Sequence, residues 1–226
     1  MLGFTFTGFI QLHYTFLQCV VLKLHIFTCS RAVQYLVMNK TILAFVGMPG
    51  SGKSTCIDYL TANDLPSIYF GGVVVEEVKK RNSGVVNEKM EKIVREEFRK
   101  KDGMAAIAKR ALPAIHTKLS VSEVVILDGL YSWSEYTLLK KEFGDSLIII
   151  AIAANKKLRH ERLAKRPVRP LTSDEVSRRE ISEIENLEKG GPIAIADYTL
   201  TNNADPEMLI EKLDALLKHL KVDYFK

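Results

Sequence analysis

Short apolar runs alternate with longer segments of helical periodicity along most of the chain. The runs cover residues 41–47, 66–70, 122–129, 145–153 and 197–202. Each has the length of a strand that is buried on both faces, and each is too short for a buried helix. Strands that alternate with helices predict a parallel sheet covered on both sides, with functional residues at the carboxyl ends of the strands.

Between these runs, apolar residues recur every three or four positions, which is helical spacing. Gly103 is expected to divide the segment 87–115 into two helices. The clearest helix is the last one, where Asp205 stands at the N-cap position and Pro206 at the first helical position. We expect its leucine face to pack back on the sheet.

Residues 1–37 are a different kind of sequence, because they are rich in aromatic and apolar residues and hold no Asp or Glu. A membrane-spanning helix needs about 20 mostly apolar residues. Polar residues interrupt this segment too often for a good span, so no membrane partner is expected unless the segment is translated. Our interpretation is that translation starts at Met38 and that residues 38–226 form one domain.

The charge balance argues against a nucleic-acid partner. The net charge is +5, but Lys23 and Arg31 lie in the first 37 residues, and the remaining body is near +3 with both signs mixed along it. The three cysteines have neither paired nor metal-ligand spacing, which indicates a reducing compartment. We therefore expect a cytoplasmic protein, either a monomer or a dimer.

The segment "GMPGSGKS", residues 47–54, fits the pattern GxxxxGK[ST] between a predicted strand and a predicted helix. Backbone N–H groups of such a turn point inward, and the helix start adds positive charge, so the turn binds polyphosphate. Lys53 is expected to reach the β and γ phosphates and Ser54 to bind Mg²⁺. The predicted nucleotide-binding residues here are Gly47, Pro49, Gly50, Ser51, Gly52, Lys53, Ser54 and Thr55.

Asp128 ends the strand "VVILD" at the edge of the sheet where a nucleotide would lie. A carboxylate there is predicted to bind Mg²⁺ together with Ser54. The alternative is an aspartate that only forms the turn or helix cap before Gly129.

Six arginines surround two prolines in residues 158–180. Arg162 and Arg166 lie four positions apart, on one face of a helix that ends before Pro167. Phosphoryl transfer needs mobile positive charge in a closed site, so we predict a lid over about 158–180. The alternatives are a solvated basic surface and an RNA-binding stripe, although the aromatic residues expected of the latter are absent.

Four segments, "GMPGSGKST", "VVILDG", "ERLAKRPVR" and "IADYTLTNNAD", resemble the small P-loop kinases of the nucleoside monophosphate kinase type. Among these they are similar to dephospho-CoA kinases and to the adenylate-kinase-like proteins of archaea. The resemblance implies an α/β P-loop NTPase fold, a three-layer sandwich around a five-stranded parallel sheet. It also implies ATP with Mg²⁺, and a lid carrying Arg162, Arg166 and either Arg169 or Arg179.

The sequence departs from that family after the second strand, where an aspartate is usual and Gly72 and Val75 stand instead. A general-base role then falls to Asp128, Glu76 or Glu77, or to no residue, because phosphoryl transfer depends mostly on positioning and charge neutralisation. Gly71 and Gly72 either make a turn or let an acceptor approach the backbone. The aromatic residues after Asp128 either belong to the core or stack on an acceptor: Tyr131, Trp133 and Tyr136.

The expected function is an ATP-dependent phosphotransferase acting on a small nucleotide-like acceptor, either dephospho-CoA or a nucleoside monophosphate. Its catalytic residues would be Lys53, Asp128, Arg162 and Arg166, and Arg169 would contact the nucleotide. Two rivals remain, namely a regulatory protein that binds ATP without transferring phosphate, and an RNA-associated ATPase.

Overall fold

The computed structural model describes residues 40–167 and 170–222. The expectations for residues 1–37, for the start at Met38 and for Arg169 therefore lie outside the described residues. Within the described ranges, no helix has both the length and the apolar composition that crossing a bilayer requires.

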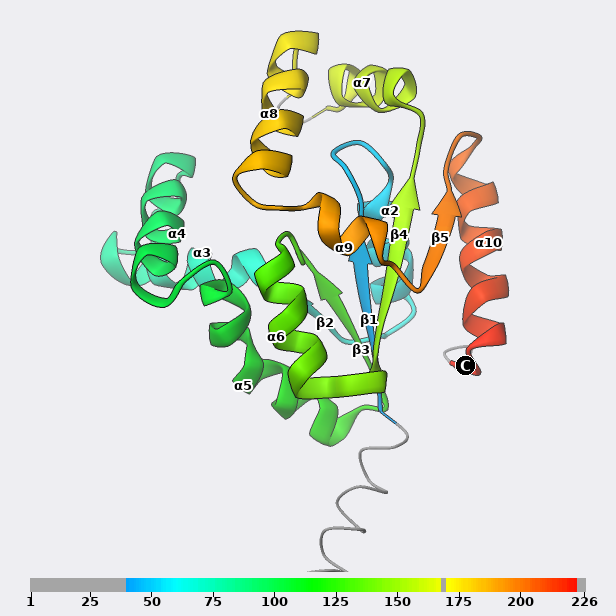
Figure 1. Cartoon of the computed structure of the whole chain (residues 1–226), viewed down its shortest axis with the longest axis horizontal. Helices are drawn as coiled ribbons and strands as arrows, with labels where there is room; N and C mark the ends of the chain where they lie inside the picture. Colours follow the sequence, from blue (N-terminus) through cyan, green and yellow to red (C-terminus); the bar gives the residue numbers. More distant parts are fainter. Residues whose placement is uncertain (1–39, 168–169, 223–226) are drawn as a thin grey trace, which may run out of the picture. The chain divides into compact units, whose positions relative to one another are not determined.

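A five-stranded parallel sheet forms the centre of the fold, as predicted (Figure 1). Its spatial order is β2-β3-β1-β4-β5, so β1 lies between β3 and β4. The observed strands lie within the predicted runs: β1 (Thr41–Val46), β2 (Ser67–Tyr69), β3 (Val124–Asp128), β4 (Leu147–Ala153) and β5 (Tyr198–Thr201).

The helices connect successive strands and cover both faces of the sheet. They are α2 (Lys53–Ala62), α3 (Phe70–Arg81), α4 (Glu88–Asp102), α5 (Ala106–Val121), α6 (Trp133–Phe143), α7 (Lys156–Lys165), α8 (Ser173–Glu185), α9 (Gly190–Ala194) and α10 (Pro206–His219), with a short 3₁₀ turn at Gly144–Ser146. Gly103 separates α4 from α5, as expected. Asp205 occupies the N-cap of α10, but its side chain accepts no capping hydrogen bond there.

Alternate side chains of β1 enter two separate cores. Ile42 and Ala44 pack with helices α3, α4, α5 and α6 on one face of the sheet, whereas Leu43 and Phe45 pack with α2 and α10 on the other. A strand that is buried on both faces has to be apolar at every position, which explains the continuous run 41–46. The result is a three-layer sandwich, as predicted.

Helices α7 and α8 lie beyond the carboxyl ends of the strands, above the loop that joins β1 to α2 (Figure 1). They contain most of the predicted lid, and the two residues that are not described follow α7 in the sequence. Functional residues of open parallel sheets gather at this edge.

Candidate functional site

The glycine-rich turn 47–54, called the P-loop below, connects β1 to α2. Gly47, Gly50 and Gly52 all have positive φ angles, of 149°, 77° and 105°. A Cβ atom on Gly47 would overlap the carbonyl oxygen of Ile152. The glycines are therefore required both by backbone conformation and by close packing.

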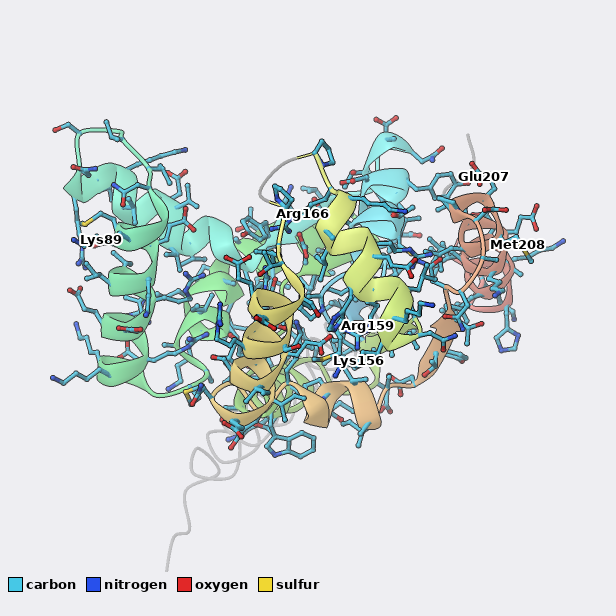
Figure 2. The ribbon with its side chains drawn as sticks, turned by 90° about the horizontal axis from the view of Figure 1, so that it is seen from above. Lys89, Lys156, Arg159, Arg166, Glu207 and Met208 are labelled. Carbon is cyan, nitrogen blue, oxygen red and sulfur yellow. The ribbon has the colours of Figure 1, made fainter. Side chains whose placement is uncertain are left out.

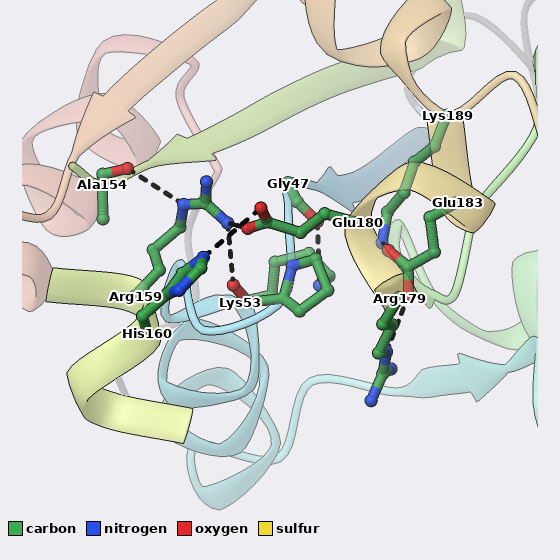
Figure 3. Close-up of polar contacts among 10 residues, drawn as sticks. Gly47, Lys53, Ala154, Arg159, His160, Arg179, Glu180, Glu183 and Lys189 are labelled. Atoms are coloured by element: carbon green, nitrogen blue, oxygen red, sulfur yellow. Dashed lines mark hydrogen bonds and ion pairs between the residues drawn. The ribbon is translucent and has the colours of Figure 1, made fainter. Parts of the chain in front are cut away.

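Lys53 begins α2, and its Nζ donates a hydrogen bond to the Gly47 carbonyl oxygen at 3.2 Å (Figure 3). Its pKa is lowered to about 8, chiefly because burial disfavours the ammonium and then because Lys189 lies near it. The carboxylates of Glu183 and Asp128 act in the opposite direction. The side chain thus lies at the centre of a group of charges contributed by several elements.

Asp128 ends β3 and is brought beside Lys53 by the pairing of β1 with β3. The pKa of its carboxyl is raised, because burial disfavours the charged form and the Lys53 ammonium offsets only part of this effect. Ser132, and not Asp128, caps α6 through a capping box with Glu135, so the fold does not need Asp128 as a helix cap. Ser54 is the second residue of α2, and its hydroxyl with the Asp128 carboxylate supplies oxygen ligands of the kind that Mg²⁺ prefers.

Asn202, immediately after β5, holds the P-loop from a distant part of the chain. This side chain is only 5% exposed, and its Nδ2 donates to the Ser51 carbonyl oxygen at 2.8 Å. Arg162 of α7 donates to the Asn202 carbonyl oxygen at 3.0 Å and to that of Ala204 at 3.2 Å. The structure therefore places Arg162 at the end of β5, bound to the residue that supports the P-loop.

Arg159 connects α7 and α8 to the P-loop. It donates to the carbonyl oxygens of Ala154 at 3.2 Å and Pro49 at 3.3 Å, and it forms a buried ion pair with Glu180 of α8 (Figure 3). His160 also faces Glu180, with Nε2 at 3.4 Å from a carboxylate oxygen. Sequence reasoning singled out neither Arg159 nor Glu180 as a functional residue.

A second charged group lies on the other side of Lys53 in Figure 3. Lys189 is only 1% exposed, forms an ion pair with Glu183, and has its Nζ 4.6 Å from the centre of the Tyr131 ring. Glu183 also accepts a hydrogen bond from Arg179 Nε at 2.9 Å. No local motif marks Lys189 or Glu183, because only the fold brings them to Lys53.

The glycines after β2 are part of a helix. Gly71 and Gly72 lie in the first turn of α3, so they do not form a separate turn. A Cβ atom on Gly71 would overlap the far end of the Tyr69 ring as it lies in the structure. Tyr69 is paired in register with Asp128 on the neighbouring strand. Tyr69 therefore neighbours Asp128 at the carboxyl edge of the sheet, whereas Gly72 and Val75, which stand where an aspartate is usual, lie within α3.

The remaining predicted residues occupy different places. Arg166 is the C-cap of α7, at the end opposite Lys156 (Figure 2). Trp133 is 40% exposed and packs against Tyr136 with a ring-centroid distance of 5.2 Å. Tyr136 packs against the core, whereas Tyr131 contacts Lys189. Of the three aromatic residues, one therefore packs on the core, one lies beside Lys189, and Trp133 is partly exposed.

Comparisons with known proteins agree with this architecture. Residues 43–188 match the family model described as an AAA domain. A UPF0200/UPF0201 protein of Archaeoglobus fulgidus is 36% identical over 190 residues, which are 82% of this chain and 57% of that protein. A UPF0200 protein of Thermococcus kodakarensis is 34% identical over 170 residues, which are 74% of this chain and 90% of that protein.

Among solved structures, TT1252 from Thermus thermophilus is similar to this chain with a TM-score of 0.54 and 24% identity. The match covers 80% of this chain and 98% of that one. This likeness supports the α/β P-loop fold that the sheet order and the glycine-rich turn already indicate. The chain therefore belongs to the AAA-domain family of P-loop proteins and to the UPF0200 proteins.

Proposed function

We propose that this protein is an ATP-dependent phosphotransferase, and that its acceptor is a small nucleotide-like molecule. Dephospho-CoA and nucleoside monophosphates are the leading acceptors, because the sequence resembles the kinases that act on them. Bound ATP with Mg²⁺ would supply the phosphoryl group and neutralise part of its charge.

One observation carries the proposal, namely the attachment of α7 and α8 to the P-loop. Arg159 donates to Pro49 of the loop and pairs with Glu180 of α8, so both helices of the predicted lid are bonded at the phosphate-binding turn. A cover at this place excludes water, which favours transfer to an acceptor over hydrolysis. The desolvation of Lys53 agrees with such a cover.

The residues then have distinct roles in the proposed reaction. Lys53 would hold the β and γ phosphates, while Ser54 and Asp128 would hold the metal. Arg166 and Arg169 would neutralise charge that develops during transfer. Where the acceptor oxygen carries a proton, Asp128 would take it as the new bond to phosphorus forms and the bond to the ADP oxygen breaks; a phosphate acceptor needs no base.

The test is an acceptor panel with the full chain. Mg-ATP is incubated with dephospho-CoA, AMP, CMP, UMP and unphosphorylated nucleosides, and both ADP and the phosphorylated product are measured. We expect one acceptor to raise ADP formation well above the water reaction, and Lys53→Ala to abolish this increase. Lys156→Ala, which changes an exposed lysine of α7, is the matched control and is expected to leave turnover intact.

The rival functions predict other results in the same panel. A regulatory protein would bind ATP while no acceptor raised turnover, and that outcome contradicts the kinase proposal. The ATP turnover of an RNA-associated ATPase would rise on addition of RNA and not on addition of small acceptors. One set of reactions therefore contains RNA in place of an acceptor.

A further inference from the structure

Glu183 of α8 accepts hydrogen bonds from two cationic side chains at once. One of its oxygens pairs with Lys189 Nζ, and the other accepts from Arg179 Nε at 2.9 Å (Figure 3). Lys189 and Glu183 are both buried. Two donors that converge on the two oxygens of one carboxylate form the arrangement by which proteins bind a phosphate or carboxylate group of a ligand.

Burying a lysine is costly unless an anion accompanies it. Burial lowers the pKa of Lys189, and Glu183 opposes that effect. For Glu183 burial raises the pKa, but Lys189 and Arg179 outweigh it, and the net shift is downward. The cluster thus holds a negative charge between two positive ones: Lys189 and Glu183 are buried, whereas the Arg179 side chain is 45% exposed.

The position of the cluster points to the acceptor side of the site. Arg159 contacts the P-loop and pairs with Glu180 on one side of Lys53, whereas Lys189 and Glu183 lie on the other (Figure 3). Lys189 Nζ stands over the ring of Tyr131, three residues after Asp128. The cluster therefore acts on Lys53 from a different place than Arg159, which bonds to Pro49 of the P-loop.

We propose that Lys189 and Arg179 bind a phosphate group of the acceptor, and that Glu183 occupies the position of this phosphate until the acceptor binds. This inference rests on the proposed phosphotransferase function and narrows it to acceptors that are already phosphate monoesters. Glu183 would then swing away, and the incoming phosphate would take over its two cations. Unphosphorylated nucleosides would lack the group that displaces Glu183 and would be poor acceptors.

Inorganic phosphate is a direct probe of this site. The full chain is first saturated with Mg²⁺ and the nonhydrolysable ATP analogue AMPPNP, which fills the nucleotide phosphate positions, and phosphate is then titrated by calorimetry. We expect Lys189→Met to weaken phosphate binding by at least about tenfold, and Glu183→Gln to strengthen it by about tenfold, because the internal competitor loses its charge. Acetate, titrated in a parallel arm, is expected to bind more weakly than phosphate.

The opposite signs of these two changes separate ligand binding from a structural role. If the ion pair only stabilised the fold, Glu183→Gln would weaken phosphate binding or leave it unchanged, and either result overturns the inference. Unchanged binding in Lys189→Met, or tighter binding of acetate than of phosphate, overturns it as well. Lys165→Met, an exposed lysine of α7, serves as the charge-matched control.

Lys189→Met leaves Glu183 buried with one partner fewer, so the fold is checked by circular dichroism and by AMPPNP affinity. The double variant Lys189→Met with Glu183→Gln removes both charges together; it is expected to fold like the wild type and to lack phosphate binding. Phosphate binding by the folded double variant at wild-type strength contradicts the inference.

The titration needs no turnover, so it distinguishes this inference from the proposed function. Phosphate binding with the predicted signs supports the anion site even if no acceptor in the panel is phosphorylated, in which case the phosphotransferase proposal alone fails. Conversely, efficient transfer to an unphosphorylated nucleoside, with the same KM in Lys189→Met, supports the function and overturns the inference.

Discussion

Arg159 of α7 and Glu180 of α8 form a buried ion pair above the P-loop, and the same guanidinium donates to the Pro49 carbonyl oxygen at 3.3 Å. One side chain therefore joins three segments that are far apart in the sequence. If α7 and α8 open as a lid, either Glu180 has to leave Arg159 or Arg159 has to leave the P-loop.

Removal of Glu180 is expected to destabilise the protein strongly. In Glu180→Ala the Arg159 guanidinium stays buried and loses its carboxylate partner, which typically costs about 3–5 kcal/mol in the free energy of unfolding. Urea denaturation of the full chain measures this loss. Glu185→Ala changes an exposed glutamate of the same helix and is expected to alter stability by less than about 0.5 kcal/mol. Equal losses in the two variants would show that the pair contributes little.

The affinity for ATP is expected to fall above pH 8. Lys53 has its pKa lowered to about 8, so its ammonium loses the proton as the pH rises through that value. The neutral amine of Lys53 cannot neutralise phosphate charge, so binding is expected to need the protonated side chain. The dissociation constant of Mg-ATP should then rise about tenfold for each pH unit well above the pKa. Calorimetry in buffers of different ionisation enthalpy should also detect proton uptake on binding near pH 8.5.

Lys53→Arg is the control for this pH dependence, because a guanidinium keeps its charge throughout the range. The variant is expected to bind Mg-ATP with an affinity that changes little between pH 7 and 10. A wild-type affinity that is equally flat over this range would contradict the assignment of the titrating group to Lys53.

Gly52→Ala is expected to impair nucleotide binding as well as stability. Gly52 has a φ of 105°, and an added Cβ would overlap the Asn202 side chain that supports Ser51. Gly84 also has a positive φ, of 90°, but no atom lies within 4 Å of its Cβ position. Gly84→Ala therefore isolates the backbone cost, about 1 kcal/mol, and should leave ADP affinity unchanged. Equal ADP affinity in the two variants would mean that Asn202 does not shape the P-loop.

The sequence predicts the sheet well because its strands are local apolar runs, each bounded by a turn or a helix signal. Residues 41–46 and 147–153 are recognisable without any knowledge of their neighbours. The start of α3 is less predictable: Gly71 and Gly72 suggest a turn, yet they lie in the first turn of the helix. Glycine is a poor helix former, so the sequence alone does not predict a helix that begins at these residues.

The site shows the same division. The P-loop can be predicted from the sequence because all its residues are contiguous. Asp128 can be predicted because it ends an apolar strand. Lys189 follows Lys53 by more than 130 residues, in a turn with no recognisable motif, and only the packing of α8 and α9 over the sheet brings the two lysines together. Ionic partners that are this far apart in the sequence can be identified only once the fold is known.

Arg162 provides the last prediction, because the sequence and the structure suggest different roles for it. As a catalytic arginine of a lid, it would act on the transferred phosphate, and Arg162→Ala would lower kcat while ADP affinity stayed near that of the wild type. In the structure it donates instead to the carbonyl oxygens of Asn202 and Ala204, and Asn202 in turn holds Ser51 of the P-loop. We therefore expect Arg162→Ala to weaken ATP and ADP binding to a similar degree, by about tenfold, as is typical when an interaction of about 1.4 kcal/mol is lost.

Asn202→Ala is the informative partner variant, because it removes the next link of the same chain of hydrogen bonds. If Arg162 acts through Asn202, the double variant should bind ADP about as weakly as Asn202→Ala alone, since interactions that share one partner are not additive. Asn203→Ala is the matched control, because this exposed neighbour accepts a hydrogen bond from the Asn155 backbone at 2.8 Å and not from the P-loop. Additive losses in the double variant, together with a fall in kcat, would restore the catalytic assignment of Arg162.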